Sequence, residues 1–314
     1  MPVECCEERF ASGSQRSLTV KTTDLLPLLN LEDDASLFSL IDGAQNQDLH
    51  KLGLERKKGL GFHSLLDASA NFDAVYAGPL LVEHAHRNAC TVLAGIVNVE
   101  GSANYVSLMT TSQPVEALVS RLAWMTNVVH EDGTEWIMRY YDPRILPHWL
   151  AVLNRDQRDI ALKGIKQWLY IDVRGSAQII HGTPALDASF EAAAPMCMSP
   201  AQHEILMARC MPYMIMDLLA SDNVDELQAM PAHERYDFLA TQLGRAQAYG
   251  LESVPDLKTY CMLGLMFGPG FDRYRVAAAT LDTRDAGSFN DRILAWAPAH
   301  WGAMSQDAEL ALHS

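Results

Sequence analysis

Two aspartates, Asp42 and Asp142, are the residues of this sequence best suited to acid–base chemistry. Paired carboxylates can act as general acid and general base when the fold brings them together. Each aspartate also lies where the chain is expected to turn, because Gly43 follows the first and Pro143 follows the second. Turn and helix-cap roles explain both residues without catalysis, so we interpret both as structural.

Arg139 lies in an apolar stretch that predicts a strand over residues 135–141. A buried guanidinium needs a partner, because an unpaired charge is costly to remove from water. Asp142 or Asp42 is the obvious candidate for that partner. The alternative is that Arg139 faces solvent from its strand.

His84 and His86 form the most ligand-like histidine pair, because residues two apart in a strand point to the same face. A metal site needs three or four converging ligands, and only His63 or Asp42 offers a further donor. We therefore expect neither a metal nor a cofactor. Cys90 leaves a Cys–His nucleophile open, but no recognisable catalytic context surrounds it.

The strong catalytic motifs are absent from the sequence. It contains no Gly-x-Ser-x-Gly elbow, no phosphate-binding Gly-x-x-x-x-Gly-Lys, no Gly-x-Gly-x-x-Gly and no His-Glu-x-x-His. The absence of these motifs is compatible with a protein that is not an enzyme. An enzyme of unknown reaction that uses Asp42, His84, His86 or Asp142 stays open as the alternative.

Hydrophobic periodicity and turn signals predict an α/β N-terminal lobe, with a mixed sheet and flanking helices, followed by an all-α C-terminal lobe. Pro79 lacks an amide donor, which favours an edge or bent strand at residues 74–82. The other strands are expected at residues 37–41, 104–109, 167–173 and 177–181. Helices are expected at residues 115–125, 145–153, 200–219, 231–249, 253–267 and 289–296.

The same signals divide the chain into four parts. Residues 1–33 lack periodicity and are expected to form a flexible tail. Residues 34–182 form the α/β domain, 183–198 a linker rich in small residues, and 199–314 the helical lobe. The sequence shows no internal repeat.

The formal net charge is −15, from 24 Lys and Arg against 39 Asp and Glu. This balance argues against nucleic-acid binding and against docking on anionic lipid, since both need a basic face. The N-terminus lacks a signal-peptide pattern, and no apolar run reaches the ~18 residues of a membrane span. We expect a cytoplasmic protein without membrane insertion.

Acidity and methionine are both concentrated in the second part of the chain. Residues 183–314 hold 8 basic and 17 acidic side chains, and ten of the 14 methionines follow residue 195. Methionine-rich surfaces can repack around different apolar partners. We therefore name Met207, Met211, Met214 and Met216 as candidate partner-binding residues, with a place in a helical core as the alternative.

Several segments resemble the bacterial type VI secretion adaptor, or chaperone, family of the Tap/VasW type. Residues 36–45 and 77–82 are similar to two early elements of the family, and residues 111–122 to its Ser-capped helix. Residues 132–146, which include Arg139, Asp142, Pro143 and Arg144, resemble its most specific signature. Residues 165–168 fit the motif that closes the domain, so the resemblance covers residues 34–182 in order and spacing.

The resemblance implies a non-catalytic protein that binds a toxic effector and helps load it onto the spike (VgrG-type) protein of the secretion tube. In that setting a set of residues would fix structural corners, namely Asp42, Gly43, Pro79, Arg139, Asp142, Pro143 and Arg144. An immunity-type protein that blocks a toxin is a further alternative. Such a protein needs only the toxin as partner.

Overall fold

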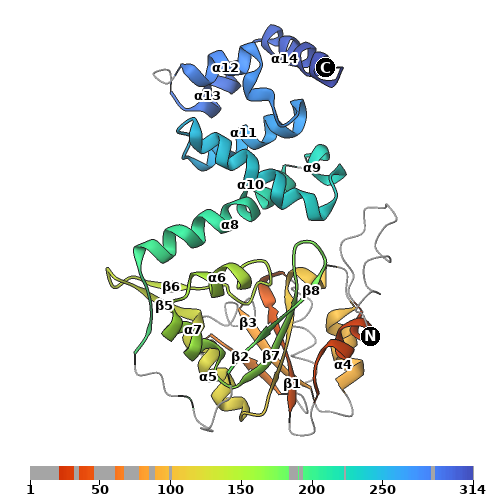
Figure 1. Cartoon of the computed structure of the whole chain (residues 1–314), viewed down its shortest axis with the longest axis vertical. Helices are drawn as coiled ribbons and strands as arrows, with labels where there is room; N and C mark the ends of the chain where they lie inside the picture. The colour runs from red at the N-terminus through yellow and green to blue at the C-terminus, as the bar shows by residue number, and fades with distance from the viewer. Residues whose placement is uncertain are drawn as a thin grey trace. The chain divides into compact units, whose positions relative to one another are not determined.

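The structure is a computed structural model that describes residues 21–31, 35–45, 61–66, 78–84, 89–98, 101–183, 190, 194–222, 224–283 and 287–313. The chain divides into two compact units, Met1–Ser199 and Pro200–Ser314. The first unit combines sheets with helices and the second is helical, which confirms the predicted fold class (Figure 1).

A six-stranded sheet forms the centre of the first unit. Its strand order is β2-β3-β1-β4-β7-β8, and all neighbouring strands are antiparallel. The antiparallel pairing differs from the mixed sheet that we expected here. The strands are β1 (Ser36–Asp42), β2 (Phe62–Ser64), β3 (Pro79–His84), β4 (Val106–Thr111), β7 (Ile165–Ile171) and β8 (Ala177–His181).

Side chains alternate along β1 and place apolar residues on both faces of the sheet. Leu37 and Ile41 join a core cluster that includes Leu93 of α4 (Ala89–Val97). Phe38 and Leu40 point to the opposite face and are also fully buried. In Figure 1, α4 lies on one side of the sheet, while α5 (Val115–Thr126) and α7 (Arg155–Leu162) lie on the other.

A second, three-stranded sheet has the order β6-β5-β9 and contains the mixed pairing. Its strands are β5 (Asn127–His130), β6 (Glu135–Ile137) and β9 (Met196–Met198), with β9 parallel to β5. The predicted strand over residues 135–141 ends early, because the chain turns inward after Ile137. Tyr140 anchors this turn by donating its hydroxyl hydrogen to Leu122 O at 2.7 Å.

Three expectations about element positions need correction. The expected flexible tail contains α1 (Thr22–Leu25) and a 3-10 turn over Leu26–Leu28, and Leu25 and Leu29 belong to the core. The expected linker contains β9, whose two methionines are buried. Pro79 is the first residue of β3, an interior strand, where the missing amide disturbs little of the ladder.

The remaining elements of the first unit are short helices and turns. The predicted helix over residues 115–125 is confirmed as α5, and α6 (Leu146–Val152) falls within its predicted range. An Asn154–Gln157 capping box starts α7. The 3-10 turns η2 (Gly43–Gln45) and η3 (Ser102–Asn104) precede β2 and β4.

The second unit packs its helices around one apolar core, which includes Leu239, Tyr260, Phe271 and Phe289. Its polar centre is Asp272, which pairs with Arg245 and accepts a hydrogen bond from the Tyr260 hydroxyl at 2.9 Å. The helices are α8 (Pro200–Ser221), α9 (Asp225–Ala229), α10 (Ala232–Ala248), α11 (Val254–Phe267), α12 (Arg275–Asp282), α13 (Phe289–Leu294) and α14 (Pro298–Leu312).

Candidate functional site

Asp42 and Asp142 meet at one end of the six-stranded sheet. Asp42 is the last residue of β1, and its amide donates to Tyr105 O at 2.9 Å. Asp142 lies in the turn before α6, where its carbonyl accepts from Ile145 N at 2.9 Å. The strand end and the turn place two carboxylates that are 100 positions apart within reach of the same side chains.

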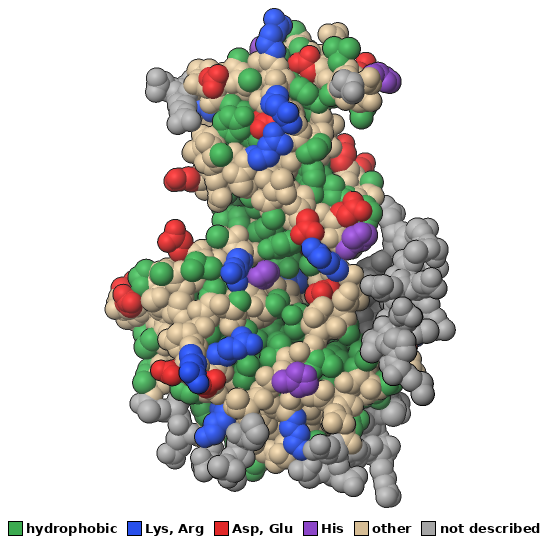
Figure 2. Space-filling view, in the orientation of Figure 1, with side chains coloured by type: hydrophobic (Ala, Val, Ile, Leu, Met, Phe, Trp, Pro, Cys, Tyr) green, Lys and Arg blue, Asp and Glu red, His purple; other side chains and the backbone are tan. Residues whose placement is uncertain are grey.

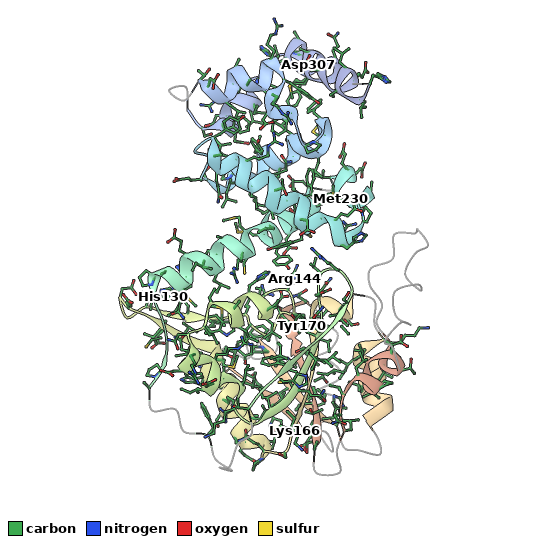
Figure 3. The ribbon with its side chains drawn as sticks, viewed as in Figure 1. His130, Arg144, Lys166, Tyr170, Met230 and Asp307 are labelled. Atoms are coloured by element: carbon green, nitrogen blue, oxygen red, sulfur yellow. The ribbon has the colours of Figure 1, made fainter. Side chains whose placement is uncertain are left out.

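Two arginines from the same turn neutralise the pair. Arg139 donates from Nη2 to Asp42 Oδ2 at 2.5 Å, and the same nitrogen lies 4.0 Å from Asp142 Oδ2. Arg144 donates from Nη2 to Asp142 Oδ2 at 2.9 Å and from Nε to Asp142 Oδ1 at 3.1 Å. The predicted partner for Arg139 is thus confirmed, and both candidate acids lie beside it. Figure 3 labels Arg144 just before α6.

Gln45 and Tyr141 complete this cluster, and the sequence pattern predicted a role for neither residue. Gln45 donates from Nε2 to Asp42 Oδ2 and to Asp142 Oδ2, at 3.1 Å in each case, so it bridges the two carboxylates. Tyr141 is buried next to them. Gln45 is the last residue of the turn that follows Asp42. Its place in this turn, close to Asp42-Gly43, was the only sequence signal for its contact with the carboxylates.

The electrostatics of the cluster favour fixed charges. Both aspartate side chains have 0% exposure, whereas the Arg139 side chain is 45% exposed. Burial opposes the charge of Arg139, but the hydrogen bond and the negative charge of Asp42 outweigh it and raise the pKa of Arg139. Burial and the nearby carboxylates raise the pKa of Tyr141 to about 12.

This arrangement is suited to holding chain segments together. Both carboxylates accept hydrogen bonds at each oxygen, including backbone donors at Ala44 and Arg144. The cluster joins the end of β1, the η2 turn and the turn before α6, and it carries two positive and two negative charges.

The candidate histidines do not assemble into a ligand set. His84 is buried, and its Nε2 lies 2.5 Å from the Ser39 hydroxyl. His63 pairs with Leu81 across β2 and β3, so these two side chains lie on one face of the sheet. Val82, the next residue of β3, lies on the other face together with His84, because side chains alternate along a strand. His63 and His84 therefore point to opposite faces. His86 and the Cys90 side chain lie outside the described residues.

No group of three or more potential metal ligands occurs among the residues that the structure describes. In the same part of the chain, none of the helices is long and apolar enough to cross a membrane.

The remaining predicted structural residues lie around the same end of the sheet. Gly43 donates its amide to Gly78 O at 3.2 Å, next to Pro79, which pairs with Asp42 across β1 and β3. Pro143 is buried between Asp142 and Arg144.

The four candidate methionines of α8 differ in exposure. Met207 is 42% exposed, and Ile205 beside it is 47% exposed. Met211 and Met216 pack partly buried against the core of the second unit, and Met214 is half-buried. Met207 therefore offers the clearest surface of the four.

A buried cation that the sequence pattern did not predict lies in α5. Arg121 is 1% exposed, and it donates to Ile160 O at 2.5 Å while its guanidinium stacks 4.5 Å from the Phe190 ring centre. Burial lowers the pKa of Arg121 to about 10. The signal was an arginine on the apolar face of a predicted helix.

Part of the chain matches a family model. Neither the curated proteins nor the solved structures contain a match to the chain. Residues 37–159, which hold Asp42, Arg139, Asp142 and Arg144, match the family model described as a domain of unknown function, DUF4123.

Proposed function

We propose that this protein is a non-catalytic cytoplasmic adaptor that binds a type VI secretion effector and helps load it onto a VgrG-type spike protein. The matched domain, residues 37–159, lies within the region that resembles the adaptor family. The segment with the most specific resemblance, residues 132–146, falls inside the match.

The carrying observation is the Asp42–Arg139–Asp142–Arg144 cluster. These four residues come from the resembling segments, and their charges neutralise one another at the end of the sheet. The carboxylates best placed for acid–base chemistry are thus engaged in holding a corner of the fold. A rigid, self-paired corner supports a scaffold that binds a partner rather than a site that transfers protons.

The test is purification of the tagged full-length chain from its native cell, with mass spectrometry of the proteins that accompany it. An adaptor co-purifies with both an effector and a VgrG-type spike protein. Recovery of a toxin without the spike protein supports the alternative hypothesis of an immunity-type protein. A turnover that Asp42→Asn abolishes in a folded protein would contradict the adaptor proposal.

The exposed methionine of α8 gives this test a matched pair of variants. We expect Met207→Asp to weaken effector recovery, because it places a charge on an exposed apolar site. Val254→Asp, a similar change at an exposed residue of α11, serves as the control. Equal recovery of the effector with both variants would show that Met207 is not part of the binding surface. The adaptor proposal itself would then be decided by the co-purification result.

A further inference from the structure

The β5–β6 hairpin ends the small sheet with an open strand edge. Val128 pairs with Trp136, and Thr126 O accepts from Met138 N at 2.8 Å. At the hairpin end, His130 N donates to Thr134 O at 2.9 Å. In an antiparallel ladder such bonded pairs alternate with non-bonded ones. The amide and carbonyl of Trp136 therefore face β5, while those of Glu135 and Ile137 face away from it.

The outward edge is also exposed and apolar. Ile137 is 59% exposed and Trp136 is 42% exposed, although strand edges in proteins are usually guarded by lysine, proline or a covering segment. In the described part of the chain, β6 has β5 as its only strand neighbour. Residues 126–138 contain no lysine or arginine, and no proline.

The hairpin is acidic as well as apolar. Glu131, Asp132 and Glu135 are all exposed. Asp132 closes the turn by accepting from Thr134 N at 2.9 Å, which fixes its charge near the edge. Acidic and hydrophobic side chains lie together where the hairpin reaches the left side of the space-filling view (Figure 2). His130, labelled in Figure 3, packs against Trp136 with ring centres 4.4 Å apart and the ring planes tilted by 42°.

We propose that the β6 edge binds an extended segment of a partner protein as an added strand, and that this segment alternates apolar with basic residues. The outward amides and carbonyls of Glu135 and Ile137 supply the main-chain hydrogen bonds. Ile137 supplies apolar contact, and Glu131, Asp132 and Glu135 select for basic side chains. A second copy of the chain is a poor occupant, because it would bring two acidic hairpins together.

The assignment of this segment to the secretion effector or spike rests on the proposed function, whereas the edge and its charge do not. The test therefore uses a synthetic peptide and the full-length chain. The probe is a blocked peptide of about nine residues that alternates Lys with Val, long enough to form one strand. Two control peptides are compared with this probe. One alternates Glu with Val, and the other alternates Lys with Ser and has the same charge as the probe.

Residue-resolved amide hydrogen exchange gives the diagnostic readout. In the free protein, the amides of Glu135 and Ile137 should exchange fast, whereas the Trp136 amide is already protected by β5. The Lys–Val peptide should slow exchange at Glu135 and Ile137 and change Trp136 little. The Glu–Val and Lys–Ser peptides should bind at least about tenfold more weakly, since each lacks one half of the recognition.

Two variants separate edge binding from general attraction to an acidic protein. Glu135→Lys should weaken the Lys–Val peptide about tenfold. Ile137→Pro should abolish edge protection, because it removes an outward amide and no bond to β5. Ile160→Lys, at an exposed isoleucine of α7, is the matched control and should leave binding unchanged.

Equal binding to wild type and Glu135→Lys, or protection elsewhere in the chain, would overturn the proposal. Concentration-dependent protection of Glu135 and Ile137 without peptide would identify a second copy as the occupant and overturn it as well. Either result leaves co-purification of effector and spike untouched, so failure of this inference is distinguishable from failure of the proposed function.

Discussion

His84 is a buried histidine whose protonation works against folding. Its Nε2 contacts the Ser39 hydroxyl, while its Nδ1 has no hydrogen-bond partner in the described part of the chain. Burial lowers the pKa of His84 from 6.5 to about 4. Between pH 6.5 and about pH 4, His84 is therefore protonated in the unfolded chain but neutral in the folded chain. The stability from this residue is present above pH 6.5 and is lost as the pH falls toward 4.

We expect the free energy of unfolding to fall by about 2 kcal/mol from this group between about pH 7 and pH 4.5. Urea titrations at both pH values measure it. The control is the double variant Ser39→Ala/His84→Leu, which removes the titrating ring and its hydroxyl partner together. Other titrating groups cancel in the comparison, so an equal loss of stability in both proteins would show that His84 is not the cause.

The carboxylate–arginine cluster shows which residue roles the sequence can indicate. Arg139 lies in an apolar stretch of sequence, and the cost of burying an unpaired charge indicated Asp42 or Asp142 as its partner. The ion pair forms although the Arg139 side chain is 45% exposed. Gln45 could not be found in this way, because a neutral amide carries no comparable penalty. Its bridge between the two carboxylates depends on where η2 points its side chain, which only the folded chain specifies.

At the scale of elements, local patterns located β1 and α10 better than they located strand ends. The β1 strand and the α10 helix follow from apolar periodicity and clear turn or Gly signals. The short β6 strand could not be read correctly, since residues 138–141 continue the apolar pattern while tertiary contacts of Tyr140 end the strand. The β9 strand depends on a partner, β5, that is distant in sequence.

Gly182 provides an element-scale prediction about the end of β8. A Cβ at this position would overlap the carbonyl oxygens of Leu162 and Ile165, which belong to the chain beside it. Backbone atoms cannot move aside as a flexible side chain can. We expect Gly182→Ala to lower the free energy of unfolding by about 3 kcal/mol or more, measured by denaturant titration.

The matched change is Gly95→Ala in α4, where the added methyl group meets nothing within 4 Å. Alanine is the better helix former, so this variant should gain about 0.5–1 kcal/mol. If Gly182→Ala lowers the free energy of unfolding and Gly95→Ala raises it, the loss at Gly182 is a steric effect of that site and not a general effect of replacing glycine. Tolerance of Gly182→Ala would mean that the strand end is not packed against residues 162–165.

At the scale of the whole molecule, each unit holds its own apolar core. The cluster around Leu37 and Leu93 draws only on the first unit, and the cluster around Leu239 and Tyr260 only on the second. Composition indicated this division, because methionine and acidic residues increase where the helical part begins. The boundary between the units lies at residues 199–200, next to the expected start of the helical lobe at residue 199.

Separate cores predict that a core defect in one unit leaves the other unit's exchange unchanged. Leu118 in α5 and Leu239 in α10 are both fully buried leucines on helices, one in each unit. Truncation of either to alanine should cost about 2–5 kcal/mol in its own unit, because each leaves a cavity.

Hydrogen-exchange mass spectrometry of the full-length chain reports both units at once. Leu118→Ala should speed exchange in β1 and β4, and Leu239→Ala in α10 and α11, with no crossover. Faster exchange in both units from either variant would show that the two cores unfold as one.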